Sequence, residues 1–547
     1  MNYRTMSILA LLAASAAQAT TYYAASNGAA DADCLTPQTA GTLDLAVSKA
    51  TADGDIVQLA AGDYDRSTTP VTLSVAGITL KGATDDPTQT VLVGPGTAKS
   101  MTGVVVTKKA TIRDLTIRNF YLTGKGGAAV AGANGTATAA SNLTAINCRI
   151  ENNRASSSGT NARYNRAAPV YGGTWSHCVF VGNSNTVGNG GAADSGTYYN
   201  CVFTNNTAQY YGGALYLGTA NKCLFIKNST TASGCCAGAV YGGTSRNCAF
   251  IENSSLQGGA AAAVASDKGY FYNCTFRHNT ATSKGVGGGA LAGKDNNSIT
   301  ATNCVFENNI VAKGDGTGGA ARYGVYTDCV FSGNTTGNSG QGGALEAGIA
   351  TRCLFVGNSA RHGSGTHNTT ANFCIYSNNV PQTTYDGSGV ALYQGKALNC
   401  LIVNNRATRK NTGIIKSALL VNCTIVGNSV TTASYAAATD GTYTNCLFMS
   451  NTMDIAGGTH VHSLYKTKTG SPTLRDCLQK TDAKFNAGAN ASLPYYALRG
   501  KSPAKDAGID AGWTAASLDL LGKKRLVGTV DIGCYEYSPG GFRLFVQ

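Results

Sequence analysis

The stretch Asn200–Tyr216, which reads NCVFTNNTAQYYGGALY, contains the two signals that decide the fold. The first is the pattern Cys-x-[Phe/Ile/Tyr]-x-x-Asn, which occurs thirteen times between Cys148 and Asn451, with 21 to 30 residues between successive cysteines. A repeat of that length, with one short strand-like core per period, is the signature of a solenoid. The cysteines of the pattern are Cys148, Cys178, Cys201, Cys223, Cys248, Cys274, Cys304, Cys329, Cys353, Cys374, Cys400, Cys423 and Cys446.

Each repeat is predicted to contain one strand whose cysteine and aromatic residue share a face, because residues two apart on a strand point the same way. Nine of the fifteen phenylalanines occupy the aromatic position, and large apolar residues at one fixed phase imply a stacked interior. The closing asparagine is expected to form a turn of fixed type, since Asn tolerates left-handed backbone geometry. Asparagines stacked in register are also expected to form a ladder.

The second signal is Gly-Gly-Ala or a close variant, which follows most of the asparagine turns, as at Gly212–Ala214. Glycine suits a tight corner, and the residues after the alanine resemble a second strand. The 69 glycines argue against helical repeats. A period of about 23 residues suits one coil of a parallel β-helix with three short strands. About fifteen coils spaced by ~4.8 Å would make a rod roughly 70 Å long.

The organisation along the chain follows from where the repeat begins and ends. Residues 1–19 are predicted to be a secretory signal peptide, with Arg4, an apolar stretch and Ala17-Gln18-Ala19 as its cleavage site. Residues 20–100 are expected to form the N-terminal cap and first coils, with a short helix within 41–50 covering the open end. Residues 101–455 carry the β-helix repeats, and residues 456–547 are expected to form an irregular C-terminal cap.

The net charge, the apolar stretches and the cysteines indicate which partners, locations and metal sites are expected. The formal net charge is +13, but no run of five or more Lys and Arg exists, so a nucleic-acid partner is not expected. No later stretch reaches the ~18 apolar residues of a membrane helix, so the mature chain is expected to be exported, either extracellular or at a bacterial cell surface. The column of cysteines is interpreted as buried thiols rather than disulfides. No metal site is expected, because no Cys-x-x-Cys pair exists and the six histidines are scattered.

The chain resembles a known group of proteins. The sequence GDIVQLAAGDY at 54–64, after a short helix, is similar to the start of secreted right-handed parallel β-helix proteins of the pectate-lyase-like superfamily. The repeats resemble those of polymorphic outer-membrane proteins, and Ser502–Tyr537 resembles the C-terminal end of choice-of-anchor surface proteins. The resemblance implies an all-β, right-handed parallel β-helix. It implies little about activity, because this fold carries lyases, hydrolases and adhesins alike.

The candidate site is the residue two places after Gly-Gly-Ala, which should stack in one column over neighbouring coils. Arg322 and Glu346 are expected on adjacent coils and are the catalytic candidates, although an ordinary surface ion pair is the plainer interpretation. Aromatic rings beside charged groups suit sugar binding, although a stabilising tyrosine stack explains them equally well. The ligand-binding candidates are Asp194, Tyr216 and Tyr241, together with Tyr171 and Tyr393; Ala262 and Ala292 fill the column between them.

Two functions from different classes remain open. The first is an exported, non-catalytic, adhesin-like surface protein that binds glycans or proteins along its sides. The second is a polysaccharide lyase or glycoside hydrolase for acidic polysaccharide, the only case in which Ca²⁺ would be expected as a cofactor. Scattered carboxylates favour the first. A stripe of outward apolar residues between each cysteine and aromatic residue, such as Val202 and Leu447, predicts a covering loop or a partner surface.

Overall fold

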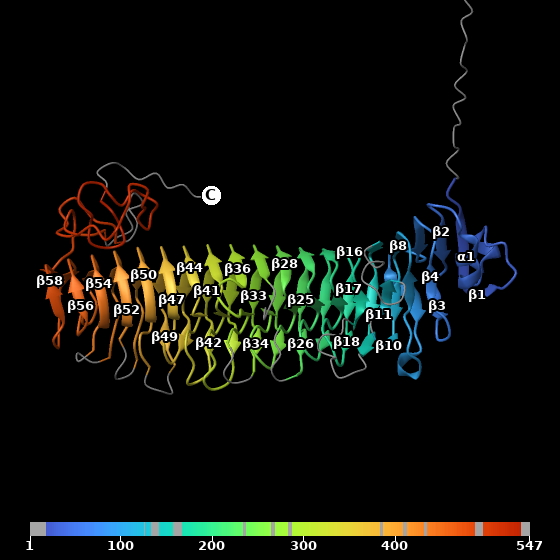
Figure 1. Ribbon diagram of the computed structural model, residues 1–547, viewed down its shortest axis with the longest axis horizontal. Helices are drawn as coiled ribbons and strands as arrows, with labels where there is room; N and C mark the ends of the chain where they lie inside the picture. Colours follow the sequence, from blue (N-terminus) through green and yellow to red (C-terminus); the bar gives the residue numbers. More distant parts are fainter. Residues whose placement is uncertain are drawn as a thin grey trace, which may run out of the picture.

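The computed structural model shows one long rod of stacked coils, with a smaller lobe on one side near its C-terminal end (Figure 1). Residues 1–17 of the expected signal peptide and the Cys235-Cys236 pair lie outside the described residues. The structure describes residues 18–124, 126–132, 142–156, 167–232, 237–263, 268–282, 287–382, 387–408, 413–431, 435–486 and 496–537.

Three parallel sheets run along the rod, so the chain is a right-handed parallel β-helix. Sheet A has two short strands in most coils, such as β19 (Ala193–Asp194) and β20 (Thr197–Tyr199). Sheet B has one strand per coil, from β3 (Gly62–Asp65) to β59 (Leu478–Gln479). Sheet C runs from β10 (Tyr121–Thr123) to β49 (Val380–Pro381). Sheet B contains 18 strands, so the rod has eighteen coils in its described part rather than about fifteen. At ~4.8 Å per coil, this corresponds to a length of about 80 Å.

The cysteine and aromatic columns both face the interior, as the strand period predicts. Phe276 on β33 (Thr275–Arg277) is fully buried and stacks on Phe250 and Phe306, with ring centroids 4.8 Å apart on each side. The thirteen repeat cysteines are free thiols, and they are buried beside these rings. Cys274, for example, lies 3.5 Å from the Ser245 carbonyl oxygen of the preceding coil, the geometry of a weak S–H donor.

The asparagines form an unbroken buried ladder from Asn153 to Asn451. Each side-chain amide donates to the carbonyl oxygen of the next asparagine, as Asn309 does to Asn334 at 3.0 Å. The same amide also donates to a main-chain carbonyl of the preceding coil, here that of Phe276 at 2.9 Å. The predicted ladder is therefore confirmed.

The turn itself differs from the prediction, because the left-handed residue is the one before each ladder asparagine. Asn308, with φ 53°, precedes Asn309, and Asn205, with φ 55°, precedes Asn206. The residue before each cysteine is left-handed as well, such as Asn303 with φ 53°. Two left-handed residues thus bracket each three-residue strand of sheet B. The ladder asparagines keep ordinary backbone angles and use their amides to join coils instead.

The Gly-Gly-Ala corner needs both glycines, each for a different reason. Gly212 has φ 65°, a left-handed conformation that glycine adopts without strain. Gly213 faces the next coil so closely that a Cβ would lie 2.0 Å from the Gly238 carbonyl oxygen. The first glycine turns the chain, and the second lets adjacent coils approach. The strand predicted after the alanine is present as β23 (Leu215–Tyr216).

At the N-terminal end, the helix α1 (Leu43–Lys49) packs beside β1 (Thr21–Ala29). The Thr42 side chain accepts from the Leu45 amide at 3.3 Å and caps the helix. Leu43 and Ala46 are buried and join the core of the rod. None of the helices in the described part of the chain is long and apolar enough to cross a membrane.

The C-terminal region differs from the expected cap in two respects. The coils do not stop at residue 455: strands β56 (Thr459–Val461) to β59 add further turns. The following described residues, 480–486 and 496–537, do not close the end. They fold back as the lobe seen in Figure 1 and pack on the outer face of sheet B. This lobe, called the C-terminal lobe below, covers Leu401 and Leu447 of the apolar stripe.

Three asparagines at one corner of the rod hold the C-terminal lobe. Asn399 donates to the Leu518 carbonyl oxygen, Asn422 to that of Asp531 and Asn445 to that of Ile509, at 2.7–3.2 Å. Arg525, which is fully buried, donates to Asn399 and to Glu536.

The acidic residues of the C-terminal lobe accept backbone amides, as turn chemistry predicts. Asp519 accepts from the amides of Leu521, Lys523 and Glu536, and Asp510 accepts from those of Gly512 and Trp513. Burial, followed by the nearby Asp531 charge, raises the pKa of Glu536 to about 8. These carboxylates are parts of a folded lobe that is anchored to the rod.

Candidate functional site: an outer column of charged and aromatic residues

The predicted column exists, and strand register defines it. Arg322 pairs with Glu346 on the next coil, and Tyr216 pairs with Tyr241. The same register adds His367 after Glu346, and Lys416 after Tyr393. The outer column, as it is called below, consists of Tyr171, Asp194, Tyr216, Tyr241, Ala263, Ala292, Arg322, Glu346, His367, Tyr393, Lys416 and Thr439.

One predicted member of the column is wrong by one residue. Ala262 pairs with Val240 and is buried in the interior, whereas Ala263 pairs with Tyr241 and holds the column position. The left-handed corner of this coil is Gly259, the second glycine of the motif rather than the first. The motif is therefore displaced by one residue here, and a one-residue shift on a strand exchanges its two faces.

The N-terminal part of the outer column is packed rather than open. Tyr216 and Tyr241 stack as predicted, with ring centroids 5.1 Å apart, and Tyr241 also lies 4.6 Å from Tyr211. Tyr171, Asp194 and Tyr241 are buried. Asp194 accepts from the Ser195 hydroxyl at 2.9 Å. These residues were predicted to bind ligand. Their burial and ring stacking equally fit a cluster that stabilises the fold.

Arg322 and Glu346 lie on adjacent coils as predicted, but each has a different partner. The Arg322 guanidinium lies 4.7 Å from the ring centroid of Tyr323. Glu346 is instead bonded to the Nδ1 atom of His367, at 2.5 Å. Glu346 and His367 are both less than a tenth exposed, so this carboxylate–imidazole pair is shielded from solvent. The surface ion pair that the sequence suggested is replaced by a buried pair one coil further on.

An aromatic stack continues from this pair. The His367 ring stacks on Tyr393, with centroids 5.2 Å apart, and His362 stacks on the same tyrosine at 5.1 Å. Burial, reinforced by the charges of Arg361, His367 and Lys416, lowers the pKa of His362 to about 4. His362 is therefore neutral near pH 7 and acts as an aromatic neighbour rather than a cation. Tyr393 presents a ring that is only partly buried.

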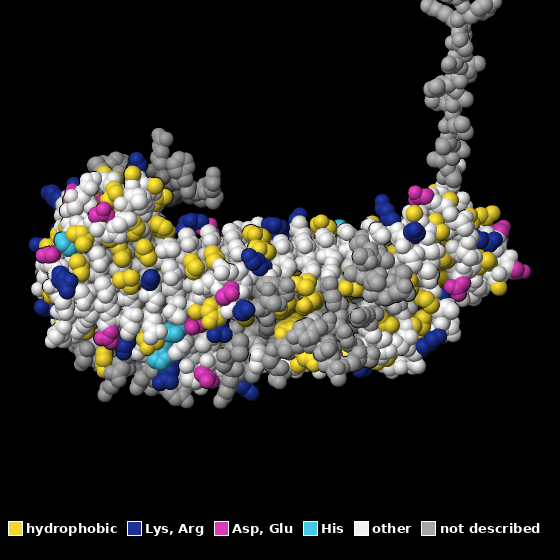
Figure 2. Space-filling model, viewed as in Figure 1, with side chains coloured by type: hydrophobic (Ala, Val, Ile, Leu, Met, Phe, Trp, Pro, Cys, Tyr) yellow, Lys and Arg dark blue, Asp and Glu magenta, His cyan; other side chains and the backbone are white. Residues whose placement is uncertain are grey.

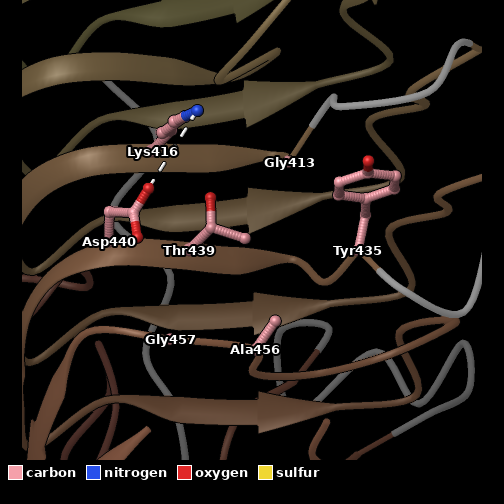
Figure 3. A pocket seen from close by; sticks show the side chains of 7 residues that line it. All are labelled: Gly413, Lys416, Tyr435, Thr439, Asp440, Ala456 and Gly457. Carbon is pink, nitrogen blue, oxygen red and sulfur yellow. Dashed lines mark ion pairs between the residues drawn. The ribbon is translucent and has the colours of Figure 1, made fainter. Parts of the chain in front are cut away.

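Beyond Tyr393 the outer column opens into a surface hollow of about 260 Å³ (Figure 3). Lys416 and Asp440 face each other across one side, with 4.0 Å between Nζ and Oδ2. Tyr435 stands on the other side, and Thr439 lies between them. Gly413, Ala456 and Gly457 complete its lining.

From Arg322 to the hollow, the partly exposed members of the outer column are Arg322, Tyr393 and Lys416, which combine two cations with an aromatic ring. Figure 2 shows histidine side chains beside acidic and basic ones on this face of the C-terminal half of the rod. Among the described residues, no group of three or more His, Cys, Asp and Glu side chains could hold a metal ion. These side chains can bind a ligand by ring stacking, hydrogen bonding and charge pairing. Glu346 and His367 form the one buried acid–base pair of the outer column.

Sequence reasoning missed His367 and Lys416 because their coils lack Gly-Gly-Ala. Gly363-Ser364-Gly365 replaces the motif before His367. A different signal would have found both residues: the column residue stands seven places before the repeat cysteine. This spacing holds for Glu346 and Cys353, for His367 and Cys374, and for Lys416 and Cys423. It fails only where an insertion lengthens the coil, as at Ala292 and Cys304.

No protein-family model matches the chain, and no curated protein matches its sequence. Among solved structures, the chain is similar to the pectate lyase Pel9A, with 10% identity and a TM-score of 0.22 over 95% of this chain and 96% of that one. A mannuronic acid-specific family 6 polysaccharide lyase from human gut microbiota matches with 12% identity and a TM-score of 0.29, over 76% and 87% of the two chains. Tailspike protein 3 of bacteriophage CBA120 matches with 12% identity and a TM-score of 0.26, over 87% and 64%. The parallel strand register of the chain itself shows its fold, which is a right-handed parallel β-helix.

Proposed function

We propose that this chain is an exported β-helix protein that binds polysaccharide along the outer column between Arg322 and the Lys416 hollow. The observation that carries the proposal is the partly exposed ring of Tyr393, flanked by Lys416 on one coil and the Glu346–His367 pair on the other side. Sugars are bound by aromatic faces that contact their C–H surfaces and by charged or amide groups that contact their hydroxyls.

The geometry of the column supports a chain-like ligand. Successive column residues are one coil apart, or about 4.8 Å, which is comparable with the length of one sugar unit. Arg322, Glu346, His367, Tyr393 and Lys416 occupy five consecutive coils. The partly exposed members, Arg322, Tyr393 and Lys416, would therefore meet separate sugar units of one extended chain. Arg322 and Lys416 at the two ends favour an acidic polysaccharide over a neutral one. An adhesin-like role at a cell surface, with a glycan as partner, is the setting that this site suits.

A second candidate is cleavage of the bound polysaccharide, and the Glu346–His367 pair is the observation that favours it. Its carboxylate holds the imidazole by Nδ1 at 2.5 Å, which orients the ring and leaves Nε2 as the nitrogen for proton transfer. Arg322 and Lys416 would neutralise the carboxylate of an acidic sugar. A lyase of this kind would abstract a proton next to that carboxylate, and the described residues offer no carboxylate cluster for Ca²⁺.

The test is a screen of the purified chain against acidic and neutral polysaccharides, with and without Ca²⁺. Binding, unsaturated products and reducing ends are all measured. Tyr393→Ala should weaken binding of the ligand found by roughly tenfold, as expected for loss of one stacked ring. Tyr199→Ala is the matched control, because Tyr199 is an exposed tyrosine outside the column. Equal binding by both variants would refute the site.

His367→Gln separates the two functions. If the chain only binds polysaccharide, neither the wild type nor this variant forms product, and the variant changes the affinity only modestly. If the chain cleaves, product formation should disappear while binding persists. Product formation that survives in His367→Gln would refute the assigned acid–base pair.

A further inference from the structure

The outer face of sheet B acts as a docking surface where the C-terminal lobe lies on it. Leu401 is 6% exposed and Leu447 is fully buried, although both point away from the core of the rod. The covered strands are β51 (Leu401–Val403), β53 (Thr424–Val426) and β55 (Leu447–Met449). Five of their six outward residues are apolar, and the sixth is Thr424. This face therefore accepts an apolar partner within the chain itself.

The same composition recurs on four strands that the lobe leaves uncovered. These are β17 (Val179–Val181), β21 (Val202–Thr204), β25 (Leu224–Ile226) and β29 (Ala249–Ile251). Seven of their eight outward residues are apolar, and the exception is again a threonine, Thr204. Leu224 is 40% exposed, although it belongs to a residue type that is usually buried. Contiguous apolar surface bordered by charged residues marks an interaction site.

The position of this apolar patch along the rod identifies its partner. Counted along sheet B, the lobe contacts the thirteenth and later coils, which leaves twelve uncovered. The patch occupies the fifth to eighth coils, the middle of those twelve. We propose that a second copy of this chain binds here, patch on patch, with the two rods antiparallel about a two-fold axis. The fifth coil of one copy then faces the eighth of the other, and each lobe passes just beyond the partner's N-terminal end.

The charges at the rim of the patch match this arrangement, and the position of the C-terminal lobe opposes the parallel one. Strands β9 (Thr116–Arg118) and β13 (Arg149–Glu151) form the third and fourth coils; β33 and β37 (Val305–Glu307) form the ninth and tenth. In the antiparallel pair, Glu151 faces Arg277, and Arg118 faces Glu307, at equivalent places on their strands. Within each chain, Glu151 already pairs with Arg149 at 2.7 Å and Arg277 with Glu307 at 2.6 Å, so the contacts between copies would join existing ion pairs into networks. In a parallel pair each coil would face the same coil of the other copy, so the two C-terminal lobes, which both lie on this face, would collide.

The available length is sufficient for a stable interface. Twelve coils span about 55 Å, and a strip of that length needs a width of only about 15 Å to reach the ~800 Å² per partner of a standard interface. A two-fold contact uses the same surface on both copies, so one self-complementary patch is enough.

The oligomeric state of the full mature chain tests the proposal, measured by sedimentation velocity and light scattering over a wide concentration range. We expect a dimer whose association is lost in Leu224→Asp, because the variant places a charge at the centre of the apolar contact. Leu419→Asp is the matched control: Leu419 is 38% exposed but lies on sheet A, and this variant should remain dimeric. Circular dichroism of both variants verifies that the rod is folded.

Charge exchange tests the antiparallel orientation. Glu151→Arg and Arg277→Glu should each weaken the dimer, and the double variant should restore it, because the two residues face each other across the two-fold axis. A chain that stays monomeric at every concentration would overturn the proposal. A dimer that survives Leu224→Asp, or a double variant weaker than both single variants, would overturn the assigned surface or its orientation.

Discussion

Replacing Asn309 by alanine tests whether the buried asparagine ladder holds the coils together. Asn309 is fully buried and takes part in four ladder bonds. Its amide donates to the Phe276 carbonyl oxygen at 2.9 Å and to Asn334 at 3.0 Å. Its own carbonyl oxygen accepts from the main-chain and side-chain nitrogens of Asn279, at 3.1 and 2.9 Å. The alanine variant removes all four of these bonds.

The expected cost follows from counting the stranded groups. The substitution leaves two buried donors of Asn279 without their acceptor, the main-chain N–H and one side-chain N–H. Each buried unsatisfied group costs about 1–3 kcal/mol, so the free energy of unfolding should fall by about 2–6 kcal/mol. Asn309→Asp should cost at least as much, because it buries a carboxylate oxygen against two acceptors.

Urea unfolding followed by circular dichroism measures the loss, and hydrogen exchange of the amides near β37 locates it. Asn303→Gly is the control, because Asn303 makes a similar bond to Asn273 at 2.9 Å but is exposed and left-handed. Its loss should stay below about 1 kcal/mol, since water replaces the bond and glycine keeps the backbone conformation. Equal losses of unfolding free energy in Asn309→Ala and Asn303→Gly would show that burial does not make the ladder bonds more stabilising than exposed ones.

Three further outcomes are expected. Phe276→Ala should lower the free energy of unfolding by about 3–5 kcal/mol, because it opens a cavity between two stacked rings; thermal unfolding like that of the wild type would contradict the inward column. Arg525→Met should loosen the C-terminal lobe, since it removes the buried hydrogen bond from Arg525 to Asn399 that joins the lobe to the rod, and limited proteolysis should then cut the lobe while the rod stays intact. Burial lowers the pKa of His460 to about 4, so the unfolded chain binds more protons below pH 6.5, and stability should fall by about 3 kcal/mol from there to pH 4. His460→Phe should remove that part of the acid sensitivity in thermal unfolding, and an unchanged profile would contradict it.

The interior of the rod could be predicted from the sequence because its residues recur at one phase. The cysteine, Phe276-type and Asn309-type columns face inward in all thirteen repeats, and a period of two on a strand is enough to place them. The left-handed positions could not be assigned correctly from residue type alone. Asparagines such as Asn308 and Asn309 are adjacent, and only the packing shows that the first turns the chain while the second joins the coils.

The outer column could be predicted only in part, because its residues share a position but no residue type. The adjacency of Arg322 and Glu346 followed from the glycine motif. The bond between Glu346 and His367 did not, since it depends on side-chain packing and on a coil without the motif. The packing of the C-terminal lobe on the rod was even harder to predict from the sequence. Asn399, Asn422 and Asn445 belong to the same corner position as the exposed Asn273, and only their partners distinguish them.

The separation of inward and outward columns has a consequence for how the candidate site can be probed. The inward neighbours of Arg322, Tyr393 and Lys416 are Ala321, Leu392 and Ile415, all buried, so the core is unaffected by what the outer column carries. Substitutions at partly exposed positions such as Tyr393 and Lys416 should therefore change stability by only about 0.5 kcal/mol, and a loss of binding there reports on the ligand. Glu346 and His367 are different, because removing either leaves a buried polar partner. For that pair, binding and stability must be measured together, and only a loss of activity larger than the loss of folded protein assigns it a chemical role.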